Sequence, residues 1–146
     1  MTKAPDIASL IPHQGSMCLL ERIVAWDHER IVLETSTHRS AANPLRVAGR
    51  LRAVHLCEYG AQAMAVHGAL VARAAGESAR PGMLVSLRSV TLSRDYIDDL
   101  SGPLVVEARC LQASSASQQY SFRITHADQL LAEGRAAVML SERAAK

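Results

Sequence analysis

Glu58 is a carboxylate in a segment, residues 53–75, whose side chains are mostly small or apolar. His55 lies three residues before it and Gln62 four residues after it. In a helix, side chains at these spacings share one face, so an imidazole and an amide would flank the carboxyl. Burying a carboxylate without a partner costs several kcal/mol. Glu58 is therefore either a helix carboxylate stabilised by the helix dipole or part of a functional site.

The length and composition predict one domain over residues 1–146. Of the 146 residues, 49% are hydrophobic, which is enough for a sizeable core. The formal charge of +2 does not suggest a nucleic-acid partner, which needs a strongly basic face interleaved with aromatics. No apolar run approaches the ~18 residues needed to span a membrane, and the first residues carry no signal-peptide pattern. We therefore expect a cytoplasmic protein with no membrane partner.

The cysteines do not indicate a metal site or a disulfide framework. Cys18, Cys57 and Cys110 are odd in number, widely spaced and without a CxxC pair. Such cysteines fit a reducing compartment and act as small buried hydrophobes. We expect neither a metal nor a cofactor.

The hydrophobic pattern predicts two strands, one long helix and then at least four strands. The helix covers residues 53–75 and ends near Gly76, a residue type that suits the position after a helix. It is apolar on nearly every face, so we expect a curved sheet to cover it. The prediction is an α+β fold, with an antiparallel sheet wrapped around one long central helix. The expected strands are residues 17–27, 30–38, 83–93, 104–114, 118–127 and 130–140.

Two glycines of this helix predict how closely the sheet approaches it. Gly60 and Gly68 lie eight residues apart. Eight residues correspond to roughly 80° of net rotation, so the two glycines lie on adjacent stripes of the helix. We expect both stripes to be bare for close contact with the sheet.

Two stretches resemble a known family. Residues 10–27, LIPHQGSMCLLERIVAWD, resemble the N-terminal signature of the hot-dog-fold 3-hydroxyacyl-[acyl-carrier-protein] dehydratases of bacterial fatty-acid synthesis. Residues 55–68, HLCEYGAQAMAVHG, resemble that family's central helix, where a glutamate precedes an Ala-Gln-Ala step. The likeness is closest to the dehydratase-like proteins of aryl-polyene and related polyketide-type lipid clusters, and it covers most of the chain.

The resemblance implies the hot-dog fold, a homodimer with a continuous sheet across two subunits, and an acyl-chain tunnel near the dimer interface. It also implies that an acyl carrier protein delivers the substrate. In this chemistry an imidazole removes the α-proton of a 3-hydroxyacyl thioester. A carboxyl then protonates the leaving hydroxyl, which gives a 2-enoyl product. Glu58 matches the catalytic acid of the family.

The chain departs from the family at the catalytic base. Family members carry their catalytic histidine in a Gly-His-Phe-Pro-Gly loop, and the corresponding stretch here, NPLRVAGRLRA, has none. Gly49 matches the glycine, which puts Arg50 in the histidine's place, and arginine is not a base near neutral pH. His55 is the first candidate for the missing base, and His38, at the end of a predicted strand, is the second. His13 matches a family position, where we expect it to anchor the N-terminal turn rather than to act in catalysis.

The remaining site residues are expected to bind the substrate. Gln62 would orient the carboxyl of Glu58 by a hydrogen bond. The amide of Asn43 either reaches a thioester oxygen or forms an Asx turn before proline. Gly49 and Arg50 would line the substrate site. The three arginines at positions 46, 50 and 52 either meet an acidic carrier protein or form a solvated basic loop.

Three functions remain open from the sequence. The first is a dehydratase acting on 3-hydroxyacyl thioesters of acyl carrier protein in fatty-acid or polyketide-type lipid biosynthesis. The second, favoured by the missing loop histidine, is a catalytically weak hot-dog subunit that binds acyl chains beside another protein's active site. The third is a hot-dog thioesterase, in which a carboxylate activates water.

Overall fold

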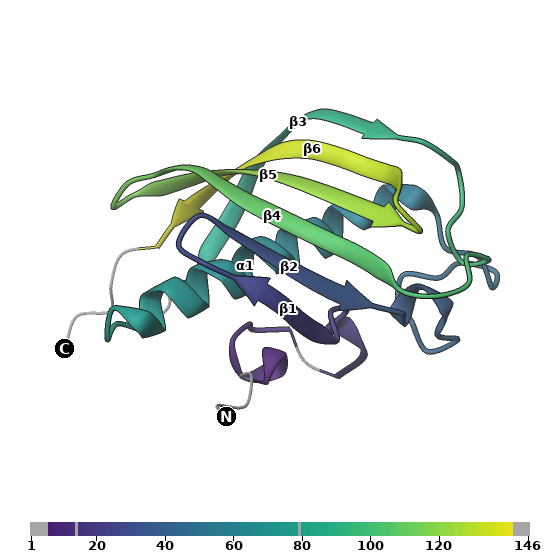
Figure 1. The fold of residues 1–146 in the computed structure, drawn as a ribbon, viewed down its shortest axis with the longest axis horizontal. Coiled ribbons are helices and arrows are strands. Elements are labelled where there is room, and N and C mark those ends of the chain that lie inside the picture. Colours follow the sequence, from purple (N-terminus) through teal and green to yellow (C-terminus); the bar gives the residue numbers. More distant parts are fainter. Residues whose placement is uncertain (1–5, 14, 79, 142–146) are drawn as a thin grey trace.

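A computed structural model describes residues 6–13, 15–78 and 80–141 (Figure 1). One six-stranded sheet lies over a single long helix, with neighbouring strands in the order β1-β2-β4-β5-β6-β3. Every neighbouring pair is antiparallel. The predicted α+β architecture is confirmed. The elements are β1 (Arg22–Trp26), β2 (Arg30–Thr35), α1 (Leu56–Ala74), β3 (Gly82–Leu92), β4 (Leu104–Ala113), β5 (Ser117–His126) and β6 (Gln129–Leu140).

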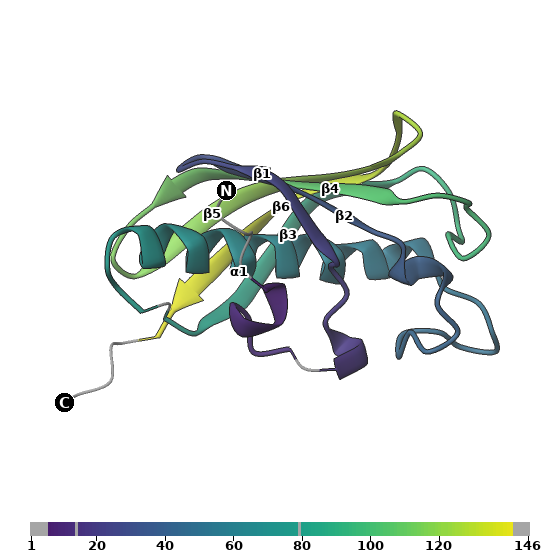
Figure 2. The ribbon, with the colours of Figure 1, turned by 60° about the horizontal axis from the view of Figure 1, so that its bottom comes forward.

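The sheet covers one side of the helix, and the N-terminal segment lies on the other side (Figure 2). That segment contains two 3₁₀ turns, η1 (Ile7–Ser9) and η2 (Gly15–Met17). Two further 3₁₀ turns, η3 (Thr37–Arg39) and η4 (Ala53–His55), flank the long loop before α1. Strands β1 and β2 form a hairpin, and β4, β5 and β6 form a meander.

The helix begins and ends for local reasons. Its first expected turn is the 3₁₀ turn η4, and regular α-helix starts at Leu56. At the other end Gly76 adopts φ +74°, a conformation that glycine reaches without strain. The N–H of Gly76 donates to the carbonyl of Arg73 at 3.0 Å, and the N–H of Glu77 donates to the carbonyl of Ala72 at 2.8 Å. These bonds satisfy the last carbonyls of the helix, so the predicted end is confirmed.

The two helix glycines have different surroundings. A Cβ on Gly60 would lie 2.8 Å from ring atoms of Phe122 in β5, so the absence of a side chain lets helix and sheet approach closely. A Cβ on Gly68 would meet only the Oε1 of Gln118, at 3.9 Å. The prediction of close sheet contact is therefore confirmed for Gly60 and wrong for Gly68. Gly68 lies where the sheet leaves open space beside the helix.

Strand β3 is an edge of the sheet, paired on one side with β6. Nearly all of its residues are exposed in the single chain. The exposed apolar side chains are those of Met83, Leu84, Val85, Leu87, Val90 and Leu92. A long apolar edge strand is the kind of surface that pairs with another chain.

A buried histidine connects the helix to the sheet. The Nε2 of His67 donates to the carbonyl of Asp27 at 2.8 Å, and its Nδ1 lies 2.7 Å from the hydroxyl of Tyr120. Because a carbonyl only accepts, the neutral ring carries its proton on Nε2 and accepts from Tyr120 at Nδ1. Burial lowers the pKa of His67 below its ordinary value, against the opposing effects of the Asp27 carbonyl and carboxylate.

Replacing Gly60 by alanine is expected to destabilise the fold. The added methyl group would overlap Phe122, and such overpacking costs about 1–3 kcal/mol. The gain from replacing a helical glycine, about 1 kcal/mol, offsets only part of this cost. Urea unfolding measures the difference. Gly68→Ala is the matched control and is expected to stabilise the protein, so equal effects at both positions would contradict the packing described.

The stability of the fold is expected to fall as the pH drops below about 6.5, the ordinary pKa of histidine. The unfolded chain binds a proton on His67 near that pH, whereas the folded chain binds it only at lower pH. The free energy of unfolding then decreases by up to about 1.4 kcal/mol per pH unit for each such histidine. Urea unfolding between pH 8 and pH 5 tests this. His67→Gln should show a shallower dependence, and an unchanged slope would exclude His67 as a source.

Candidate active site

The structure brings an imidazole to Glu58 from outside the helix. The Nε2 of His13, in the segment between η1 and η2, lies 3.2 Å from the Oε1 of Glu58. Both side chains are about one-third exposed, at 29% and 34%. Both line a cavity of about 730 Å³. His13, assigned by its sequence position to the N-terminal turn, is therefore the histidine that contacts the carboxyl.

Gln62 connects this pair to the backbone. It is fully buried, and its Oε1 accepts from the N–H of Leu19 at 2.9 Å. Its Nε2 donates to the carbonyl of Met17 at 2.7 Å and to the Oε1 of Glu58 at 3.2 Å. The bond to Leu19 sets the orientation of the amide, because only its oxygen can accept from an N–H. The predicted contact between Gln62 and the carboxyl is present, and Gln62 also holds the N-terminal segment against α1.

The two ring nitrogens of His13 have different surroundings. Its Nδ1 is buried and has no hydrogen-bond partner among the described residues. Its Nε2 faces the carboxylate at the cavity wall. Nε2 is therefore the atom that can exchange a proton with a bound molecule. The Pro-His pair within the N-terminal stretch that resembles the dehydratase family was the signal in the sequence that could have pointed to this residue.

The first candidate base, His55, does not meet Glu58. The partners of the Glu58 carboxylate in the described chain are His13 and Gln62. His55 lies in the 3₁₀ turn η4, just before α1, and is not part of the cavity wall. Spacing alone therefore does not decide the contact, because the N-terminal segment places His13 and not His55 at the carboxylate.

The second candidate base, His38, is enclosed away from the cavity. Its ring is completely buried in η3, and its Nε2 donates to the carbonyl of Leu100 at 2.8 Å. Burial lowers the pKa of His38, and the nearby His126, Arg39 and Arg46 act in the same direction. His38 does not line the cavity that contains Glu58.

Asn43 uses its amide inside the protein. Its Nδ2 donates to the carbonyl of Thr37 and to the hydroxyl of Tyr59, both at 3.0 Å. Its Oδ1 accepts from the N–H of Leu45 at 2.9 Å, which is an Asx turn. Both amide hydrogens are used, so Asn43 has no donor left for a thioester oxygen, and the Asx-turn alternative is the one observed.

Gly49 and Arg50 form a turn that faces away from the cavity. Gly49 adopts φ +76° between the bridged residues Val47 and Arg50. The Nε of Arg50 lies 3.0 Å from an Oδ of Asp98, and its guanidinium stacks 4.1 Å from the ring centre of Tyr96. Neither Gly49 nor Arg50 lines the cavity that contains Glu58. Their assignment to the substrate site stays a prediction that this cavity does not support.

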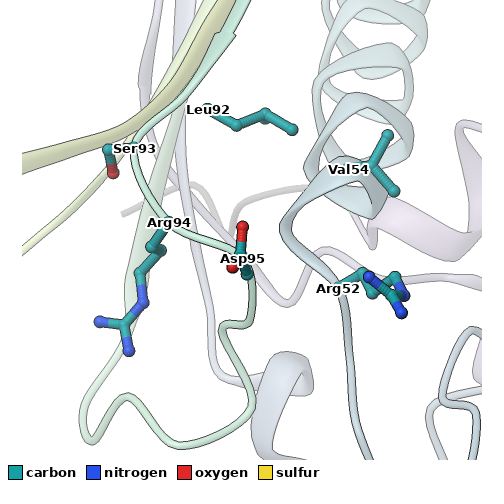
Figure 3. Close-up of a pocket in the computed structure, with 6 residues that line it drawn as sticks. All are labelled: Arg52, Val54, Leu92, Ser93, Arg94 and Asp95. Atoms are coloured by element: carbon teal, nitrogen blue, oxygen red, sulfur yellow. The ribbon is translucent and has the colours of Figure 1, made fainter.

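The basic cluster of the sequence is divided by the fold. Arg46 donates to three backbone carbonyls and holds the loop together. Arg52 lies at a second cavity of about 280 Å³ beside the start of α1 (Figure 3). Figure 3 shows Arg52 and Arg94 on opposite sides of this cavity, with Asp95 between them. Only Arg52 of the three arginines combines exposure with a cavity, and a carboxylate lies close to it.

The walls of the larger cavity are mostly apolar. Small residues of α1 form one side, and strands β3 and β6 contribute Leu84, Val138 and Leu140. Polar side chains occur at the Glu58–His13 end and again where Arg80, Ser115 and Gln118 contribute to the wall. The arrangement is a carboxylate and an imidazole in contact at the wall of a mostly apolar groove. Within the described ranges, no three His, Cys, Asp or Glu side chains are grouped as metal ligands would be.

Replacing Gln62 by leucine is expected to destabilise the protein by about 1–3 kcal/mol, because the buried N–H of Leu19 loses its partner. Urea unfolding at neutral pH gives the value. The control is Gln112→Leu on β4, where the replaced side chain is exposed, and its unfolding free energy should stay within about 0.5 kcal/mol of the parent. Equal losses in both variants would show that Gln62 does not hold the N-terminal segment.

Among the described residues, no helix combines the length and the apolar composition of a membrane span.

A search of curated proteins finds no match to the chain. Solved structures do match. The dehydratase heterocomplex ApeI:P from Xenorhabdus doucetiae superposes with a TM-score of 0.87 at 19% identity, covering 97% of this chain and 94% of that chain.

More distant structures share the fold. A hypothetical thioesterase with coenzyme A from Streptococcus pneumoniae has a TM-score of 0.60 at 12% identity, with 85% of this chain and 88% of that chain covered. AziG from S. sahachiroi has a TM-score of 0.60 at 18% identity, with 87% and 94% covered. These likenesses confirm the hot-dog fold.

The family model for the ApeP dehydratase matches residues 5–146, and the chain belongs to this ApeP-like family.

Proposed function

We propose that the protein is a dehydratase of 3-hydroxyacyl thioesters in which Glu58 is the general acid and His13 the general base. The observation that carries the proposal is the 3.2 Å contact between the Nε2 of His13 and the Oε1 of Glu58 at the end of an apolar cavity. Membership of a dehydratase family supports the reaction type. The proposal replaces His55 and His38 as the base.

The proposed reaction needs one proton acceptor and one proton donor. The Nε2 of His13 removes a proton from C2 of the substrate, and the protonated carboxyl of Glu58 delivers a proton to the hydroxyl on C3. The C3–O bond breaks, water leaves, and the electron pair from the C2–H bond forms the double bond. The imidazolium then returns its proton to the carboxylate across the contact seen in the free protein, which restores the starting state.

The supporting residues keep the pair in position. Gln62 donates to the same carboxylate oxygen that faces His13, so the other oxygen of Glu58 can point to the substrate hydroxyl. Holding both groups on one rigid frame is what makes proton transfer efficient. The reaction requires no cofactor, because side chains supply both proton steps.

The proposed substrate is an acyl group carried as a thioester on an acyl carrier protein. The apolar wall of the cavity suits an acyl chain. The carrier is an expectation from the family resemblance. Arg52, exposed beside the start of α1, is the remaining candidate among the three arginines for contact with an acidic carrier.

We further propose that strand β3 pairs with a second hot-dog chain. Its apolar residues are exposed in the single chain, and its hydrogen-bonding edge has no partner strand in the described residues. Gly82 and Leu84 of this strand also line the cavity, so a partner here would lie beside the acyl site. The expected assembly is a homodimer. The ApeI:P structure is a heterocomplex, which favours a non-identical hot-dog subunit as the alternative.

Glu58→Gln and His13→Gln are each expected to reduce dehydration by about 10²–10⁴-fold, since each removes one proton-transfer group. Formation of the enoyl thioester from 3-hydroxyacyl thioesters, on carrier protein and on coenzyme A, measures this. His55→Gln is the control and should keep the parental rate.

Other products would overturn the dehydratase proposal. Release of free thiol without enoyl product, lost in Glu58→Gln, would identify a thioesterase. Carrier binding without turnover of either kind would identify a non-catalytic subunit, and the assay would then be repeated with the partner chain present.

A further inference from the structure

Gly68 has no structural reason to be glycine. It lies inside α1, where glycine destabilises a helix relative to alanine. Its backbone is outside the left-handed region that favours glycine, and a Cβ would touch nothing closer than 3.9 Å. Gly60 in the same helix differs, because there a Cβ would overlap Phe122. What Gly68 leaves open is not packing space but part of the cavity.

Gly68 lies on the helix stripe that forms the cavity wall. The stripe runs from Glu58 through Ala61 and Ala65 to Gly68 and Ala72, at spacings of three and four residues that keep one face. Gly68 is ten residues beyond Glu58, about 15 Å along the helix axis. The nearest side-chain atom to a Cβ at position 68 would be the Oε1 of Gln118, at 3.9 Å, and Gln118 also lines the cavity.

The cavity continues past this point. Ala72, the next residue of the stripe, also lines it, together with Leu140 and Arg80. A side chain larger than a methyl group at position 68 would project into the cavity on the side of Gln118.

We propose that Gly68 sets the length of acyl chain that the cavity accepts. The inference rests on the proposed function, in which C2 and C3 of the substrate are held at Glu58 and His13. An extended chain advances about 1.2 Å per bond, so roughly 12 bonds beyond C3 bring it to Gly68. Short acyl chains end before this point, and long chains pass Gly68 into the section beyond.

The test uses binding, so it does not depend on turnover. Calorimetry would compare octyl and octadecyl thioethers of pantetheine, which cannot react, on the parent chain and on Gly68→Leu. The octyl compound should bind both proteins alike. The octadecyl compound should bind Gly68→Leu at least about tenfold more weakly, because the added leucine keeps the end of the chain from the apolar wall residues Ala72 and Leu140.

The controls separate blockage from general damage. Ala74→Leu adds the same side chain at an exposed helix position outside the cavity wall and should leave both affinities unchanged. Gly68→Ala should raise the melting temperature. Gly68→Met, with an unbranched side chain, replaces Gly68→Leu if that variant does not fold.

Each result decides between the two proposals. If the octadecyl compound binds the parent and Gly68→Leu equally well, Gly68 does not set chain length, and the proposed dehydratase is unaffected. If the parent binds neither compound, the cavity is not an acyl site and this inference fails. The Glu58→Gln assay then decides separately whether the chain is a dehydratase.

Discussion

The amide of Gln62 is the contact on which the site depends. It is buried in α1, and it bonds to the backbone of the N-terminal segment at Met17 and Leu19 and to the carboxylate of Glu58. A buried amide must have its hydrogen bonds satisfied, so the N-terminal segment is held in one position against the helix. That position brings His13 to Glu58. The side chain of Gln62 thus both holds the N-terminal segment on α1 and keeps the carboxylate of Glu58 beside His13.

Helix α1 has two neighbouring stripes, one packed tightly against the sheet and one bordering the cavity. On the sheet side, the missing side chain at Gly60 allows Phe122 to pack against the helix backbone. On the neighbouring stripe, small residues that include Gly68 border the cavity. A helix rich in alanine and glycine can do both, because the volume it leaves is filled only where the sheet supplies large side chains. Helix α1 therefore contributes to both the core and the wall of the cavity.

The loop between β2 and α1 is built for rigidity. Arg46 binds three carbonyls, Asn43 uses its whole amide internally, and His38 is buried on the carbonyl of Leu100. These residue types also occur in catalytic sites, but here their polar atoms are used by the loop. An acid–base pair can still form, since the imidazole comes from a different part of the chain. The loop precedes the start of α1, and its polar side chains do not line the cavity that contains Glu58.

The sequence by itself determined the sheet wrapped around one helix, the approximate bounds of the helix and of the last four strands, and the position of Glu58, because hydrophobic periodicity and helix-ending residues are local signals. The first strand was predicted to start at residue 17 but starts at Arg22, since residues 15–17 form a 3₁₀ turn. It also indicated the contact between Glu58 and Gln62, which follows from helical spacing. Only the tertiary structure decided which histidine meets the carboxyl. His55 is close in sequence but does not contact the carboxylate, whereas His13 is distant in sequence and is brought to Glu58 by the N-terminal segment packing on the helix. Spacing along one element predicts contacts within that element, and contacts between elements depend on packing that no local pattern encodes.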